Sequence, residues 1–163
     1  MKRRILLPIV AILIVFASLL SLPGCEKHYT VSNFTVYTRT VEPVELEEFI
    51  GKPIVVNFWA TWCGYCIMEM PAFNEAYHAN PDVQFMMVNY TQGDETIAVA
   101  SSFVLEKGYD FPVYYDAMGD ASLTYEVESF PTTLFIDRDG NLVKRVSGAM
   151  SKEELDGYLA LIK

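Results

Sequence analysis

Basic residues are scarce in this chain of 163 residues, which holds 12 Lys and Arg against 21 Asp and Glu and has a net charge of −9. Residues 1–24 contain three of the basic residues and no acidic one, so the remainder has 9 against 21 and a net charge of −12. A surface of this sign is repelled by nucleic acid and by anionic lipid headgroups. The sequence also lacks a basic patch and a glycine-rich phosphate loop. We therefore expect no nucleic-acid partner.

Cysteine and histidine are also rare: the chain has three cysteines, Cys25, Cys63 and Cys66, and two histidines, His28 and His78. A structural zinc site needs about four ligands, and neither histidine has finger-like spacing to the cysteine pair. A permanent disulfide between Cys63 and Cys66 would add little stability, because loop-closure entropy grows with loop length and this loop is short. The spacing favours a redox pair over a metal site or a structural disulfide.

The beginning of the chain has the pattern of a secretory signal. Three basic residues, Lys2, Arg3 and Arg4, precede an apolar run from Ile5 to Leu20. One alternative is an uncleaved membrane helix, because Ile5 to Leu22 is just long enough to span a bilayer. Another is free secretion after cleavage. All three alternatives place the rest of the chain outside the cytoplasm, where disulfides persist.

The stretch "LPGC", which ends at Cys25, resembles the lipobox of bacterial lipoproteins. This resemblance implies that a lipid is attached to Cys25. We therefore predict a lipoprotein signal peptide at 1–24, a polar tether at 25–32 and one folded domain at 33–163.

The folded domain reads as an α/β protein, because predicted strands alternate with predicted helices. A strand is expected at 33–41 and either a short strand or a helical turn at 42–53. The remaining elements follow in order: strand 53–60, helix 66–80, strand 82–90, helix 94–108 with an acidic start, strand 111–116, helix 121–127, hairpin 132–146 and a last helix from Ser151. Ser151 and Glu154 have the spacing of a capping box.

The cysteine pair lies where a buried strand that ends at Ala60 leads into a helix. The first backbone N–H groups of a helix have no partners within the helix, and the helix dipole adds positive charge there. Both effects favour a thiolate, so Cys63 is predicted to be the nucleophile. Cys66, one turn further along, is predicted to resolve the mixed disulfide.

The segment "VVNFWATWCGYCIMEMP" resembles the active-site segment of the thioredoxin superfamily, in particular its TlpA/ResA-like membrane-anchored branch. Further ordered matches include Pro71, the stretch through "FPVYYD" and "VESFPTTLFIDRDGNLVKRVSG", so the resemblance covers most of residues 33–163. It implies a thioredoxin-like fold, in which helices flank a central mixed β-sheet, with a TlpA-type helix–strand insertion.

The resemblance also implies roles for three residues in contact with a substrate. Pro131 matches a cis-proline that faces the disulfide and presents backbone to an incoming chain. Trp62 matches a tryptophan that flanks the nucleophile, whereas Trp59 is expected to pack in the core. Tyr65 is a third candidate for substrate contact, but the dipeptide Gly64-Tyr65 departs from the Gly-Pro of thioredoxin. The residues between the cysteines influence the redox potential, so Tyr65 leaves the direction of electron flow open.

Glu69 is a candidate for proton transfer to and from Cys66. Thioredoxin has an aspartate in its central strand, and the matching residue here, Asn57, cannot exchange protons. Glu69 follows Cys66 by three residues on the same helix face and matches the glutamate of the branch's CxxCxxExP pattern. The hypothesis is that Glu69 assists the resolving cysteine, and the alternative is a solvated surface carboxylate.

The function that this resemblance implies is reduction of partner-protein disulfides outside the cytoplasm. Electrons would come from a membrane thiol transporter of the CcdA or DsbD kind. Substrates in the branch include apocytochrome c, oxidised exported proteins and methionine sulfoxide reductases. No organic cofactor is expected, because the cysteines carry the electrons. The alternatives are a DsbA-like oxidase and a copper- or haem-binding module on a thioredoxin scaffold.

Overall fold

The computed structural model describes residues 31–163. The predicted signal peptide, Cys25 and the tether up to residue 30 lie outside the described residues. Among the described residues, no helix has the length and apolar composition to cross a membrane.

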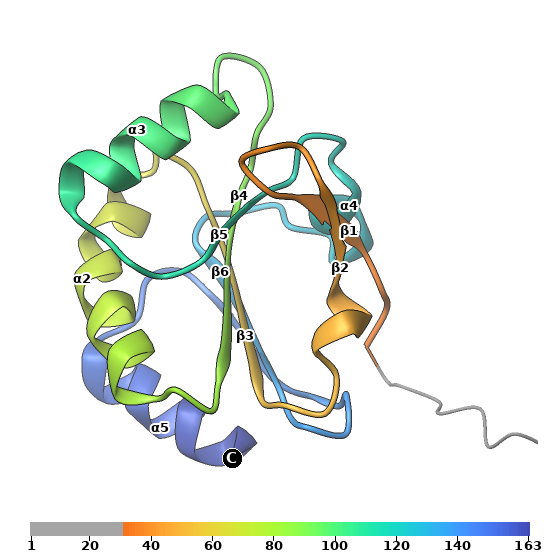
Figure 1. Cartoon of the computed structure of the whole chain (residues 1–163). Coiled ribbons are helices and arrows are strands. Elements are labelled where there is room, and N and C mark those ends of the chain that lie inside the picture. Colours follow the sequence, from red (N-terminus) through yellow and green to blue (C-terminus); the bar gives the residue numbers. More distant parts are fainter. Residues whose placement is uncertain (1–30) are drawn as a thin grey trace, which may run out of the picture.

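A seven-stranded mixed sheet forms the centre of the fold (Figure 1). Its order is β2-β1-β5-β4-β3-β6-β7, and β3, β4 and β5 are parallel while the other neighbours are antiparallel. The strands are β1 (Thr35–Tyr37), β2 (Pro43–Glu45), β3 (Ile54–Trp59), β4 (Gln84–Asn89), β5 (Val113–Tyr115), β6 (Thr132–Ile136) and β7 (Leu142–Ser147).

Helices cover both faces of this sheet, which confirms the predicted thioredoxin-like architecture (Figure 1). One face is covered by α2 (Gly64–Ala79), α3 (Ile97–Lys107) and α5 (Lys152–Ile162). The 3-10 helix η1 (Leu46–Phe49) and the short helix α4 (Asp120–Thr124) lie on the other side. The predicted insertion is also present, because α3 and β5 lie between β4 and α4 and β5 extends the parallel part of the sheet.

The central strand β3 is buried on both faces, as its continuous apolar run predicted. Val55 and Trp59 belong to the core under α2, whereas Ile54, Val56 and Phe58 belong to the core on the opposite face. Because side chains alternate along a strand, Asn57 also faces α2. A polar residue is therefore placed in the middle of an otherwise apolar layer.

Two segments differ from the sequence-based expectation or refine it. Residues 42–53 form both elements that were considered, since β2 leads directly into η1. The helix expected at 94–108 begins later, at the N-cap Thr96, whose side chain accepts the N–H of Val99. Asp94 and Glu95 therefore lie before α3 rather than in its first turn. The capping box of Ser151 and Glu154 is present as predicted.

Candidate active site

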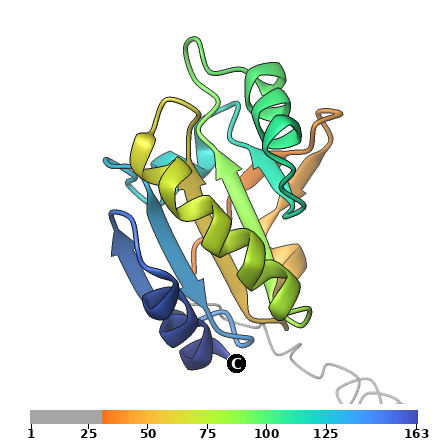
Figure 2. The ribbon, with the colours of Figure 1, turned by 90° about the vertical axis from the view of Figure 1, so that its left-hand side faces the viewer.

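Cys63 and Cys66 form a disulfide at the point where β3 ends and α2 begins. Their Cα atoms are 5.3 Å apart. Figure 2 shows that α2 starts near the C-terminal end of β4 and runs across the sheet. We call the side of the sheet at which β3 and β4 end the cysteine end. The side at which β3 and β4 begin is called the opposite end.

Cys63 lies at the start of a helix, as predicted: it is the N-cap residue of α2, and its Sγ accepts the backbone N–H of Cys66 at 3.1 Å. A sulfur in this position lies among N–H groups that have no partner within the helix. These groups and the helix dipole stabilise a negative charge on the sulfur once the disulfide is reduced. Cys63 is 6% exposed and Cys66 is 1% exposed, so Cys63 is the more accessible of the two, although both are buried.

Glu69 is buried on the same helix as the cysteine pair, which contradicts the alternative of a solvated surface carboxylate. Its side chain is 3% exposed, and it lies one helical turn after Cys66. It accepts the Nδ2–H of Asn57 at 2.9 Å and the backbone N–H of Met150 at 3.0 Å. Burial raises the pKa of Glu69 to about 7, although the bonds from Met150 and Asn57 act in the opposite direction. The carboxyl group can therefore both release and accept a proton near neutral pH.

Asn57 holds this carboxyl group in place from the central strand. Its Nδ2 also donates to Oγ1 of Thr133 at 2.9 Å, on the antiparallel neighbour β6. Sequence reasoning identified Asn57 and Glu69 but missed Thr133 and Met150. The signal for Thr133 was its polar side chain in a buried apolar strand, whereas nothing local in the sequence indicates Met150.

Exposed apolar side chains surround the disulfide. Trp62 is 61% exposed and Tyr65 is 69% exposed, as suits residues predicted to contact a substrate. Met68, which sequence reasoning missed, is 66% exposed on the first turns of α2. The ring of Trp62 meets the ring of Phe130 edge-on at 5.5 Å, and Phe130 also contacts Tyr90.

The loop before β6 brings Pro131 to the same end of the molecule as Trp62. The Phe130–Pro131 peptide bond is cis, as the family resemblance implied. Pro131 is buried, and its carbonyl accepts the N–H of Gly148 at 2.8 Å. Trp59, predicted to pack in the core, is fully buried against Phe103.

A second buried carboxylate near the cysteines was not predicted. The sequence placed Glu95 in the first turn of a helix, but the structure turns its side chain inward, where it is 4% exposed and bonded to Thr61 and Asn89. Thr61 is two residues before Cys63. The polar run between β4 and α3 was the only local signal for this contact.

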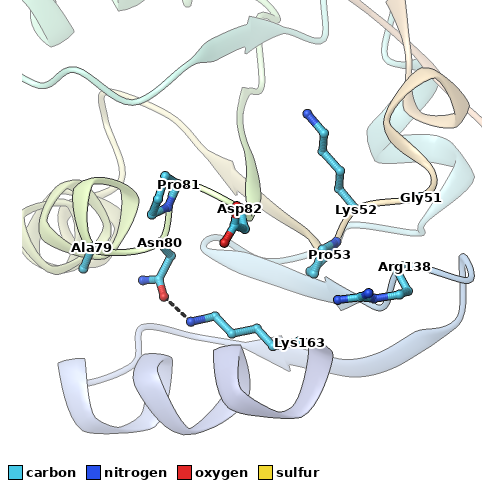
Figure 3. Close-up of a pocket in the computed structure, with 9 residues that line it drawn as sticks. All are labelled: Gly51, Lys52, Pro53, Ala79, Asn80, Pro81, Asp82, Arg138 and Lys163. Carbon is cyan, nitrogen blue, oxygen red and sulfur yellow. Dashed lines mark hydrogen bonds between the residues drawn. The ribbon is translucent and has the colours of Figure 1, made fainter.

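The opposite end of the sheet has a different surface, with an open hollow of about 460 Å³ (Figure 3). Charged side chains around it include Lys52, Asp82, Arg138 and Lys163, and Lys163 donates to Oδ1 of Asn80. None of the predicted site residues that the structure describes lines this hollow. Among residues 31–163, no group of three or more His, Cys, Asp or Glu side chains is placed to hold a metal ion.

Comparison with known proteins agrees with this geometry. The profile of the Redoxin family matches residues 27–162. The thiol-disulfide oxidoreductase ResA of Bacillus thuringiensis subsp. konkukian is 36% identical over 132 residues, which cover 80% of this chain and 75% of that protein. ResA of Bacillus subtilis strain 168 is 34% identical over 133 residues, which cover 80% of this chain and 73% of that protein.

Two solved structures extend the comparison. A secreted disulfide oxidoreductase of Mycobacterium tuberculosis, homologous to DsbE of E. coli, superposes with a TM-score of 0.69 at 31% identity and covers 78% of this chain and 95% of its own. The exposed lipoprotein thioredoxin Etrx1 of Streptococcus pneumoniae strain TIGR4 gives a TM-score of 0.66 at 30% identity, covering 80% and 99%. The chain therefore belongs to the Redoxin family, within which it is a ResA-like thiol–disulfide oxidoreductase.

Proposed function

We propose that this protein is an extracytoplasmic, membrane-anchored reductase of disulfide bonds in exported partner proteins. The observation that carries the proposal is the position of the Cys63–Cys66 disulfide at the first turn of α2, one helical turn before the buried carboxyl group of Glu69. The insertion between β4 and β5 holds a single helix, which supports a TlpA-like reductase over a DsbA-like oxidase.

The reaction is a two-step exchange that starts from the reduced protein. The Cys63 thiolate attacks one sulfur of the partner disulfide, so a mixed disulfide forms and the other partner sulfur leaves as a thiolate. Cys66 then attacks Sγ of Cys63 and releases the partner with both sulfurs reduced. Two electrons pass to the partner and the Cys63–Cys66 disulfide remains. A membrane dithiol donor of the CcdA or DsbD kind restores both thiols, without an organic cofactor.

Glu69 assists the second step by accepting the proton of the Cys66 thiol. Its pKa of about 7 suits a group that must be ionised to take this proton and must return it when the disulfide is next reduced. The pH profile of partner release tests this role. In the wild type the rate changes with an inflection near pH 7, and the inflection is absent in Glu69→Gln.

Exposed apolar side chains near the disulfide form the surface that meets the partner. Trp62 and Tyr65 contact chain segments beside the partner's cysteines, and the loop at Pro131 lies along the incoming backbone. A partner with apolar side chains next to its disulfide fits this surface, because exposed apolar patches mark interaction sites. Apocytochrome c, oxidised exported proteins and methionine sulfoxide reductases are the candidate partners.

A trapping experiment with Cys66→Ser tests the exchange mechanism and identifies the partner. The variant keeps the nucleophile but lacks the thiol that resolves the mixed disulfide, so it is expected to stay covalently bound to its substrate in cells. Mass spectrometry of the complexes identifies the partner. Cys63→Ser is the matched control and is expected to capture nothing. Equal capture by both variants, or none by either, would overturn the proposal.

The direction of electron flow is tested by the reduction potential of the cysteine pair. Thioredoxin has a value of about −270 mV and the oxidant DsbA about −120 mV. A reductase is expected to lie near the thioredoxin value or below it. A value near that of DsbA would show that the protein forms disulfides instead.

The anchor is proposed at Cys25, by lipid attachment after removal of residues 1–24. One structural relative is itself described as an exposed lipoprotein, which supports this assignment. Mass spectrometry of protein extracted from membranes provides the test. We expect the extracted protein to begin at an acylated Cys25. A protein that still begins at Met1 would rule out the lipoprotein.

A further inference from the structure

Glu95 is a buried carboxylate that the exchange reaction above does not use. It lies between the end of β4 and the start of α3, and its side chain is 4% exposed. It accepts three hydrogen bonds: from the backbone N–H of Thr61 at 2.8 Å, from Oγ1 of Thr61 at 2.5 Å and from Nδ2 of Asn89 at 2.7 Å. All three donors are neutral.

A carboxylate in this position is costly to bury unless its oxygens accept several hydrogen bonds. A shorter side chain at this position would in turn leave the buried amide of Asn89 and the partly buried donors of Thr61 without this acceptor. The Glu95 carboxylate and its donors on Thr61 and Asn89 therefore hold one another in place. Two of the three bonds go to one residue, so Glu95 fixes both the backbone and the side chain of Thr61.

Thr61 belongs to the short loop that connects β3 to the nucleophile. In this loop, residues 60–63, the N–H of Cys63 donates to the carbonyl of Ala60 at 3.1 Å, which closes a tight turn. Trp62 lies between Thr61 and Cys63 and projects into solvent beside Phe130. The backbone on the N-terminal side of Trp62 is therefore held by the bonds from Thr61 to Glu95, and the Trp62 ring rests on Phe130.

We propose that Glu95 is a positioning residue for exchange with protein disulfides: through Thr61 it holds the 60–63 loop so that Trp62 stands beside Cys63 when a partner docks. This inference rests on the proposed function, because it assumes that the substrate is a polypeptide that contacts Trp62. The segment between β4 and α3, which carries Glu95, would then support the 60–63 loop although it lies outside the CxxC motif.

The test uses the full-length protein and two substrates, insulin as a protein disulfide and 5,5′-dithiobis(2-nitrobenzoate) as a small disulfide. Glu95→Ala is expected to raise KM for insulin about tenfold, because small misplacements of substrate-positioning groups have effects of this size or larger. The rate with the small disulfide changes far less, because this substrate does not need Trp62. Acrylamide quenching gives a second readout: Trp59 is fully buried, so quenching reports on Trp62, and it is expected to increase.

Glu95→Gln separates position from charge. The glutamine carbonyl can accept the N–H of Thr61, and its amide can donate to Oγ1 of Thr61, so KM is expected to return to within about threefold of wild type. A Glu95→Gln variant as impaired as Glu95→Ala would show that charge matters instead of position, and would overturn the inference. So would a Glu95→Ala variant with the KM and quenching of wild type.

Two further variants guard against a general loss of stability. Asp137→Ala is the matched control, because Asp137 also accepts three hydrogen bonds, at the opposite end of the sheet, and it is expected to leave KM unchanged. If Glu95→Ala does not fold, Thr61→Val decides: it keeps the backbone bond and the shape but loses Oγ1, and an unchanged KM and quenching would overturn the inference. If the wild type reduces the small disulfide but not insulin, the proposed function fails, and quenching still tests the position of Trp62.

Discussion

The two ends of the central sheet differ in where they place apolar and charged groups. At the cysteine end, the exposed side chains of Trp62, Tyr65 and Met68 lie on the surface, and the carboxyl groups of Glu69 and Glu95 are buried below them. At the opposite end, charged groups lie on the surface, as is usual in soluble proteins. Charged side chains, among them Lys52, Arg138 and Lys163, surround an open hollow (Figure 3). The central strand β3, which begins there, starts with a buried apolar run.

This difference shows where the fold gives up stability for chemistry. Exposed apolar groups gain nothing from folding, and buried carboxyl groups lose hydration. We therefore expect substitutions at the cysteine end to change activity and pH dependence, and substitutions at the opposite end to change stability alone.

Glu69→Gln tests the largest expected effect. In the unfolded chain Glu69 has its ordinary pKa of 4.5, whereas in the folded protein burial raises the pKa to about 7. The folded state thus binds the proton more tightly. The resulting stabilisation is fully present below pH 4.5 and is lost as the pH rises through 7. The difference between the two pKa values corresponds to about 3 kcal/mol.

Urea denaturation of the oxidised protein across this pH range measures the effect. The free energy of unfolding of the wild type is expected to fall by about 3 kcal/mol more than that of Glu69→Gln, because all other titrating groups are shared. Glu75→Gln, at an exposed position on the same helix, is the matched control and keeps the slope of the wild type. Parallel curves for the wild type and Glu69→Gln would show that this carboxyl group is hydrated.

Trp62→Ala sharpens the comparison at the surface of the cysteine end. Loss of the exposed indole is expected to raise KM for insulin about tenfold, since an aromatic anchor contributes on the order of 1–2 kcal/mol to a protein contact. The free energy of unfolding should change by less than about 0.5 kcal/mol, as for other exposed positions. Leu105→Ala, an exposed apolar position on α3, is the control, and an equal rise in KM there would remove the special role of Trp62.

Asp137→Ala tests the opposite end, where the smallest effect is expected. The Asp137 carboxylate accepts the N–H groups of Asp139 and Asn141 and the side-chain amide of Asn141 in the turn between β6 and β7. Its loss should lower the free energy of unfolding by about 1 kcal/mol, the usual net value of such bonds. Insulin reduction below the unfolding temperature should match the wild type. A fall in activity would contradict the expectation that substitutions at the opposite end change stability alone.

The elements of this fold were predictable because their signals are local. The apolar run of β3 and the capping box at Ser151 each lie within a few consecutive residues. The position of Cys63 was predictable for the same reason, since a strand and a helix adjoin it. The family resemblance added the cis peptide before Pro131, which local reasoning would have assigned as trans.

The environment of the cysteine pair was less predictable because it is built by contacts between distant parts of the chain. The bond from Met150 to Glu69 joins residues separated by 81 positions, and the bond from Thr61 to Glu95 joins residues separated by 34. Helical spacing placed Glu69 on the face of Cys66 but could not decide whether that face was solvated. Glu95 was assigned to a helix start, where acidic residues are common, and tertiary bonding overrode this preference.

The bond from Met150 links the end of the chain to the chemistry at its middle. Met150 immediately precedes the capping box that begins α5. The start of the last helix therefore fixes an amide whose bond favours the ionised form of the Glu69 carboxyl group. A change at the start of α5 that breaks this bond while Glu69 stays buried would raise the affinity of Glu69 for its proton. The acid–base balance of the resolving step would then change even though both cysteines stay in place.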